Sequence, residues 1–241
     1  MTTAQDGERS RRSPAFLIGL TLIALFFFAG FCALGAWQVQ RLAWKRDLIA
    51  RVDARIHAPA IPAPRTAARV DEYRRVRISG HFVHDSVALV QAVTVRGAGF
   101  WVLTPLITDE GFTVIINRGF VPPDRQRDYM RPSGEVTVSG LLRLSEPGGG
   151  FLRSNDPASD RWFSRDVAAI AAARGIRGPL ANYFIDADAA ADPDAFPVGG
   201  LTVVAFPNNH LQYAITWFAL AAMVAGGYIF VMRQERKDRR E

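Results

Sequence analysis

The hydrophobic positions of this chain are concentrated in two long uninterrupted runs, one near each end. The first run is Ala15–Trp37 and the second is Leu211–Met232, and neither contains a charged residue. At about 1.5 Å per residue, a helix of roughly 22 residues spans about 33 Å, which matches the ~30 Å hydrocarbon core of a bilayer. Each run therefore predicts a transmembrane helix, and two crossings place both chain ends on one side of the membrane.

The helical pattern continues beyond the first run. Apolar residues recur at helical spacing through Arg41–Val52, with basic residues between them. We expect the helix to extend out of the bilayer, with Trp37 and Trp44 in the interfacial zone where amphipathic rings settle. The proline-rich stretch Ala58–Pro64 then ends the helix, because proline lacks a backbone donor and favours an extended linker.

Between Tyr73 and Leu144 the hydrophobic period changes to two, which indicates β-strands. The short turn Asp109–Gly111 lies between two of the runs and predicts that Phe100–Asn117 is a hairpin. Closely spaced sequential strands favour an antiparallel sheet curled into a barrel. The expected strands are Tyr73–Ser79, Ser86–Val93, Phe100–Ile107, Phe112–Asn117 and Val136–Leu144.

The remaining polar segment contains one short helix and two closing strands. Ser145–Ser159 is expected to be a loop, and Asp166 is expected to cap a helix over Val167–Arg174 that Gly175 ends. Tyr183–Ile185 and Leu201–Phe206 are the closing strands, with the loop Asp186–Gly200 between them. The fold class is thus a membrane protein with two transmembrane α-helices that flank a mainly antiparallel, barrel-like extracytoplasmic β domain. Its expected divisions are a tail at 1–14, helix 15–37, the β-rich domain 38–210, helix 211–232 and a tail at 233–241.

The charge distribution predicts the orientation of the chain. Basic residues precede the first run and follow the second, so both tails are expected in the cytoplasm by the positive-inside rule. The basic residues just after the first run, such as Arg41 and Lys45, oppose this orientation, but long translocated segments escape the rule. We expect the central domain in the periplasm and the helices in a bacterial inner membrane, because no transit-like leader is evident. The basic tail residues are Arg9, Arg11, Arg12, Arg233, Arg236, Lys237, Arg239 and Arg240.

Composition argues against several function classes. The net charge of +6 does not come with a basic face interleaved with aromatics, so nucleic-acid binding is not expected. The only cysteine, Cys32, lies inside the first run, which leaves the polar segment without a disulfide or a thiol pair for copper. His81 and His84, three apart in a strand, point to opposite faces unless a turn intervenes. No acid pair or nucleophile–base order indicates an enzyme.

His210, one residue before the second run, is the first candidate site residue. An imidazole at the outer membrane face can simply hydrogen-bond water or headgroups, or it can be an axial ligand of a haem lying partly in the membrane. In either case Asn208 or Asn209 would cap the helix. Trp37, Arg41 and Trp44 share one face of the first helix, which is either a membrane anchor or a surface that meets the start of the second helix. In the second case Arg41 would lie at the depth of His210 and could bind a haem propionate.

Asn117–Pro122 is a strand that runs into a turn and holds two further candidates. Gly119 supplies a special backbone angle, and Arg118 is either a solvated side chain or a site for an anionic group or a partner. We assign Arg118 and Gly119 to a candidate partner-binding site.

Several segments in this order resemble the Surfeit locus protein 1 family, the assembly factors of cytochrome c oxidase. One departure is Phe120, where the family is expected to favour tryptophan, although an aromatic ring is retained. The matching segments are Leu34–Arg41 with Lys45, Val76–Phe82, Gly99–Leu106, Asn117–Pro122, Val138–Arg143, and Asn209–Ala214 with Trp217 and Phe218.

The resemblance implies a role in oxidase biogenesis in which bacterial members bind haem a and assist its insertion into subunit I. It implies that His210 is the haem ligand, and that oxidase subunit I, haem a synthase and membrane lipids are partners. The leading hypothesis is therefore a non-enzymatic assembly factor that holds haem a between the outer ends of its spans. His210 would bind the iron, Arg41 and Trp37 would contact the cofactor, and Tyr213 and Trp217 would wall the site. The alternative is a cofactor-free membrane scaffold for oxidase intermediates, and whether two copies share a cofactor is left open.

Overall fold

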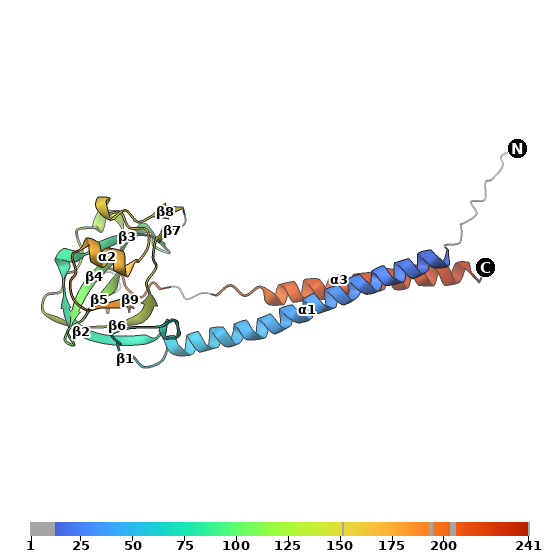
Figure 1. Ribbon diagram of the computed structural model, residues 1–241, viewed down its shortest axis with the longest axis horizontal. Helices are drawn as coiled ribbons and strands as arrows, with labels where there is room; N and C mark the ends of the chain where they lie inside the picture. The colour runs from blue at the N-terminus through green and yellow to red at the C-terminus, as the bar shows by residue number, and fades with distance from the viewer. Residues whose placement is uncertain (1–12, 151, 193–194, 203–205, 241) are drawn as a thin grey trace. The chain divides into compact units, whose positions relative to one another are not determined.

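The computed structural model of this chain describes residues 13–150, 152–192, 195–202 and 206–240. It divides into two compact units, a helical unit of residues 1–50 and 206–241 and a β unit of residues 51–205 (Figure 1). The two units are described separately below.

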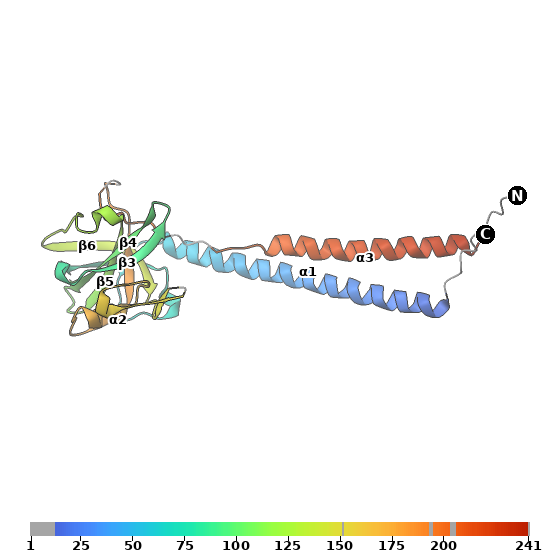
Figure 2. The same ribbon diagram turned by 90° about the horizontal axis from the view of Figure 1, so that it is seen from above.

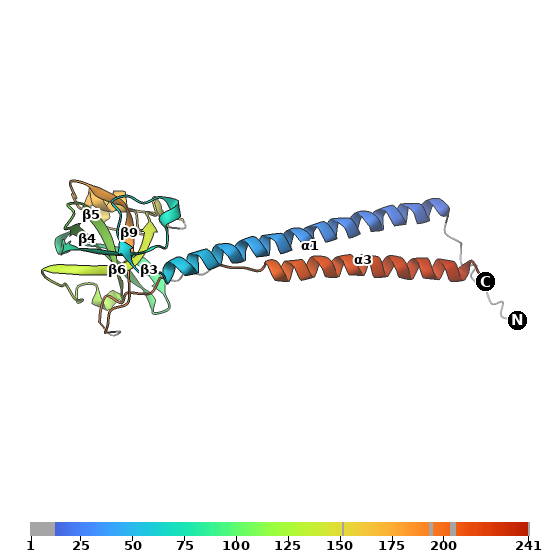
Figure 3. The same cartoon turned by 90° about the horizontal axis from the view of Figure 1, so that it is seen from below.

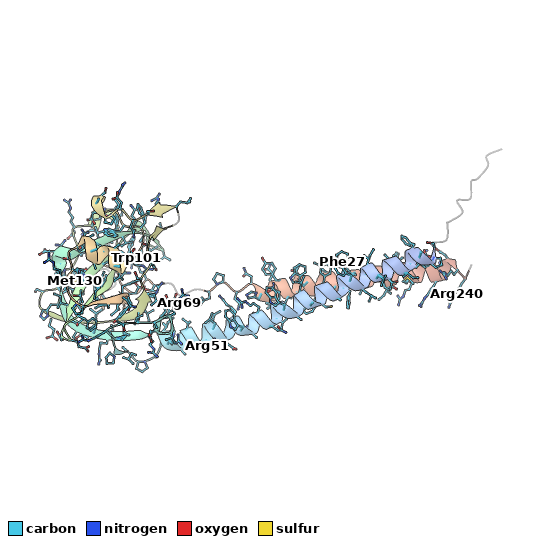
Figure 4. All side chains as sticks on the ribbon, in the orientation of Figure 1. Phe27, Arg51, Arg69, Trp101, Met130 and Arg240 are labelled. Carbon is cyan, nitrogen blue, oxygen red and sulfur yellow. The ribbon has the colours of Figure 1, made fainter. Side chains whose placement is uncertain are left out.

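Two long helices make up the helical unit. Helix α1 is Pro14–Ile56 and helix α3 is His210–Asp238, and both are long and apolar enough to cross a membrane. Most of their apolar side chains face outwards, including Phe27, which is 47% exposed and labelled in Figure 4. The prediction of two apolar helices is confirmed, and α1 continues past the first apolar run as expected.

The two helices lie side by side and run in opposite directions (Figures 2 and 3). Near the chain ends the Thr21 hydroxyl is 3.0 Å from that of Tyr228, and further along the Phe31 and Trp217 rings stack with centroids 5.7 Å apart. The α3-facing stripe of α1 includes Gly35, which is buried. Its lack of a side chain leaves room for the ring of Phe218 on α3, as small residues do at many membrane helix contacts.

The β unit is built on a closed sheet. Five strands form the barrel in the order β2, β6, β9, β5 and β4, and β2 pairs with β4 to close it. Two further strands extend the sheet, β1 beside β2 and β3 beside β4. The strands are β1 Ile61–Pro62, β2 Arg75–Phe82, β3 Ala88–Thr94, β4 Gly97–Thr108, β5 Thr113–Val121, β6 Glu135–Leu144 and β9 Leu180–Ala187.

Two hydrophobic clusters stabilise the β unit. The first includes Val76, Leu106, Ile116 and Tyr183, which lie on alternate positions of the barrel strands. The second lies under the short helix α2, Val167–Ala173, which buries Ile170 against the sheet. Because side chains alternate along a strand, β4, β5 and β9 contribute to both clusters, as adjacent Ile115 and Ile116 of β5 show.

Several local predictions are confirmed. The hairpin forms between β4 and β5, with Ile107 opposite Thr113. Asp166 caps α2 by accepting a hydrogen bond from the Ala169 amide at 3.1 Å, and Gly175 follows the helix with a φ of 64°. Asn209 occupies the N-cap position of α3, but its side chain makes no capping hydrogen bond.

Other features differ from the expectation. The sheet is mainly antiparallel and barrel-like as predicted, but two of its strand pairings are parallel, β9 with β5 and β1 with β2. The expected linker around Ala63 is tied to the sheet, because the Ala63 amide donates to the Arg77 carbonyl at 3.0 Å. The expected loop 145–159 contains the short pair β7, Gly149–Gly150, and β8, Arg153–Ser154. Of the expected strand at 201–206, residues 201–202 are not in a strand and residues 203–205 lie outside the described residues.

Candidate functional site

His210 is the first residue of α3, and its imidazole contacts α1. Its Nδ1 lies 2.8 Å from Oε1 of Gln38, a side chain that is only 8% exposed. Gln38 follows Gly35 by three residues on the stripe of α1 that packs on α3, and Ala214 and Trp217 follow His210 at helical spacing on α3. The helical spacing in both segments thus places Gln38 and His210 opposite each other on the packed faces of α1 and α3.

This hydrogen bond determines the protonation pattern of the imidazole. A carbonyl oxygen only accepts, so Nδ1 carries the proton and donates it to Gln38. In the neutral ring Nε2 then keeps its lone pair, and among the described residues no group bonds to it. His210 therefore offers one imidazole lone pair, which can serve as a single ligand to iron or another metal.

The face formed by Trp37, Arg41 and Trp44 lies elsewhere on α1. Trp37 is 54% exposed, and the Arg41 guanidinium stacks 4.0 Å from the centroid of the Trp44 ring. Of the two interpretations of this face, the one in which it meets the start of α3 is wrong, because Gln38 and Gly35 contact α3 instead. A role for Trp37 or Arg41 toward a cofactor stays a prediction.

Tyr213 and Trp217 differ in their surroundings, although they lie one helical turn apart. Trp217 stacks on Phe31 with an interplanar angle of 26°, so helix packing accounts for its position. Tyr213 is 55% exposed and is available to a ligand at the surface of α3. Their assignment as walls of a cofactor site stays a prediction.

Arg118 and Gly119 of β5 both make contacts inside the β unit. Arg118 donates through Nη2 to the Met130 carbonyl at 2.5 Å and lies over the Phe82 ring, and burial lowers the pKa of its guanidinium. Gly119 has a φ of 127°, and a Cβ there would lie 2.3 Å from the Val198 carbonyl oxygen. These contacts show structural roles for both residues, and their partner-binding role stays a prediction.

A buried ionic cluster in the β unit was not expected from the sequence. The Asp186 carboxylate, 3% exposed, accepts hydrogen bonds from Asn117 at 2.7 Å and Thr202 at 2.9 Å. It also pairs with Arg143 at 3.1 Å and with Arg165 at 3.3 Å. Burial opposes the charge of Arg165, but its bonds to Glu146 and the nearby acidic charges outweigh burial and raise its pKa.

The structure offers few alternatives to His210 as a metal ligand. Within the described ranges no three His, Cys, Asp or Glu side chains lie close enough together to hold a metal ion. His84 is the other imidazole with one engaged nitrogen, since its Nε2 is 2.8 Å from the Pro132 carbonyl oxygen, but its remaining nitrogen, Nδ1, is buried inside the β unit. A cofactor whose metal needs a single imidazole from this chain fits the described side chains better than a bare ion that needs three ligands.

Comparison with known proteins gives a consistent result. Residues 25–222 match the model of the SURF1 family. The chain is 36% identical to Surfeit locus protein 1 of Rattus norvegicus, over 98% of this chain and 81% of that protein. It is 34% identical to Surfeit locus protein 1 of Xenopus tropicalis, over 85% of this chain and 72% of that protein. It is also 33% identical to a SURF1-like protein of Monosiga brevicollis, over 97% and 94% respectively.

Proposed function

Because this chain belongs to the SURF1 family, we propose that it is a cytochrome c oxidase assembly factor that holds haem a through Nε2 of His210 and assists its insertion into subunit I. The observation that carries the cofactor role is the fixed imidazole, with Nδ1 held by Gln38 and Nε2 left with its lone pair. Metal-binding histidines commonly have their second ring nitrogen hydrogen-bonded in this way.

The surroundings of His210 suit an apolar macrocycle. Haem a supplies an iron that accepts an axial imidazole and a largely apolar ring. His210 lies at the end of an apolar helix, beside the exposed ring of Tyr213 on the same helix. Arg41 is an exposed cation on the neighbouring helix and is the proposed partner of a propionate.

The proposed location follows from the charge of the flanking segments. Both tails lie in the cytoplasm, the helices cross the inner membrane, and the β unit is periplasmic. The protein acts without catalysing a reaction, and its partners are oxidase subunit I, haem a synthase and membrane lipids. The β unit then supplies the surface that meets the oxidase subunits.

The test is the visible spectrum and extracted haem content of the full chain, purified in detergent after co-expression with haem a synthesis. His210→Ala is expected to remove the haem a absorbance while the far-ultraviolet circular dichroism stays unchanged. His57→Ala, at an exposed histidine just after α1, is the matched control and should keep the haem.

Two results would overturn the cofactor role. An unchanged spectrum in His210→Ala would exclude this ligand. A colourless wild type that still captures oxidase subunits would establish the cofactor-free scaffold instead.

A further inference from the structure

The Gln38 amide is a buried polar group inside an apolar helix pair. Its side chain is 8% exposed, and the neighbouring stripe residues Gly35 and Leu42 are also buried. A buried amide without a partner costs about 1–3 kcal/mol, so such a residue is unfavourable unless its hydrogen bond is made. Packing alone would be served as well by leucine, which has a similar volume. The hydrogen bond to His210 is therefore the feature that distinguishes glutamine at this position.

We propose that Gln38 is a positioning residue, which selects the tautomer of His210 and fixes the direction in which its metal-binding nitrogen points. This inference rests on the proposed function, since it concerns how His210 presents itself to haem a. Without an acceptor at Nδ1, the neutral imidazole would divide between its two tautomers and turn about its side-chain bonds. With Gln38 in place, one nitrogen is committed to α1 and the other is available.

The same contact determines from which side a ligand reaches His210. The two nitrogens flank Cε1 and point in widely different directions in the ring plane, and Nδ1 faces α1 through Gln38. Nε2 is therefore directed away from the Gln38 amide, and a haem held by His210 would reach the ring from a side that Gln38 does not cover.

A hydrogen-bond acceptor on Nδ1 also strengthens the donor character of Nε2. Such partners of metal-binding histidines raise the basicity of the ligand, and their loss typically weakens metal binding about tenfold to a hundredfold. A carboxylate at the same position accepts more strongly than an amide, so Gln38→Glu should increase the donor strength further. A purely structural contact predicts no such graded effect on the iron.

The first experiment measures the tautomer without haem. The full chain is labelled with nitrogen-15 in its four histidines, and long-range proton–nitrogen correlation spectra are recorded in detergent, with His210 assigned through His210→Ala. The wild type should show a protonated Nδ1 and an unprotonated Nε2, and Gln38→Leu should show a mixture. Gln40→Leu, at an exposed glutamine two residues along α1, is the matched control and should match the wild type. A protonated Nε2 in the wild type would overturn the inference.

The second experiment uses the haem-loaded chain. Gln38→Leu should lose haem about tenfold to a hundredfold faster and raise the reduction potential of the iron, whereas Gln38→Glu should keep the haem and lower the potential. Equal potentials in all three proteins, with only the melting temperature changed, would reduce Gln38 to a packing residue. A colourless wild type would count against the proposed function, while the tautomer measurement would still decide the role of Gln38.

Discussion

Gly35 of α1 lies against the ring of Phe218 of α3, so closely that a Cβ at position 35 would be 2.8 Å from the ring atoms Cε1 and Cζ. The absence of a side chain at position 35 is thus what lets the Phe218 ring pack against α1 at this level. On α1, Gly35 lies about one turn from Gln38, whereas on α3 Phe218 lies about two turns from His210. Close packing at Gly35 and the geometry of the candidate site therefore depend on each other.

Gly35→Val should separate the helices locally and weaken the Gln38–His210 contact. Overpacking of this kind costs about 1–3 kcal/mol, so the thermal transition of the helical circular dichroism signal should fall in temperature. Gly30→Val is the control, because a Cβ at Gly30 would meet nothing within 4 Å. Equal transitions for the two variants would contradict the packing role of Gly35.

The sequence predicts the elements of this protein better than their relative orientation. The apolar runs, the Asp109–Gly111 turn and the Asp166 cap are local signals, and the structure confirms the elements they predict. The sequence left open which face of α1 meets α3, because a helix that is apolar all round gives little contrast between faces. The parallel pairing of β9 with β5 depends on the whole topology and has no local signal.

Residue chemistry shows the same division between local and long-range information. His210 is recognisable from its place before an apolar run, whereas its partner Gln38 lies 172 positions away. Asp186 directly follows an apolar strand segment, which could have marked it as buried, but its partners Arg143 and Arg165 come from distant segments. Contacts of this kind can be predicted only when the pairing and register of the strands and helices are known.

Asp186→Ala should destabilise the β unit strongly. The substitution removes the most buried carboxylate from Arg143 and Arg165, each about 15% exposed or less, and leaves them only the more exposed Glu146 and Glu72. Breaking a buried ion pair from one side costs about 3–5 kcal/mol. Urea denaturation of the full chain, followed by near-ultraviolet circular dichroism, measures this loss.

The matched control for Asp186→Ala is Asp128→Ala. Asp128 pairs with Arg125 on the surface, where its side chain is 75% exposed and the loss should be about 1 kcal/mol or less. Similar losses for the two variants would show that the buried cluster carries no special stabilisation.

Tyr183 should make the β unit less stable at alkaline pH. Burial, and then the charge of Glu110, raise the pKa of its phenol above the ordinary value of 10.0. Above that pH the unfolded chain loses the phenolic proton while the folded chain retains it, so the free energy of unfolding falls as pH rises. Tyr183→Phe should cost about 1 kcal/mol at neutral pH, because the bond to the Pro64 carbonyl at 2.5 Å is lost. Urea denaturation at neutral pH and at about pH 11 should show a smaller alkaline loss in the variant; equal losses would contradict this role.

The proposed orientation can be tested with single cysteines in a Cys32→Ser background. Val70→Cys, at a 60% exposed position of the β unit, should react with a membrane-impermeant maleimide once the outer membrane is permeable. Arg240→Cys, at the labelled end of the helical unit in Figure 4, should react only after the inner membrane is opened, because both tails are expected in the cytoplasm. The reverse pattern would contradict the orientation.

Gly119→Ala and Arg118→Ala should separate a structural role from a partner role. At Gly119 the added Cβ meets the Val198 carbonyl, so the pairing of Phe120 with Val198 is disrupted and stability falls by more than the ~1–2 kcal/mol of a left-handed residue alone. Gly134→Ala is the control for that backbone strain, because Gly134 has a φ of 84° but open space around a Cβ.

Arg118→Ala should keep the β unit folded, since it removes one hydrogen bond to Met130 from a partly exposed residue. If Arg118 contacts a partner, this variant should capture less oxidase subunit I at unchanged stability; normal capture by a folded Arg118→Ala protein would contradict the partner role.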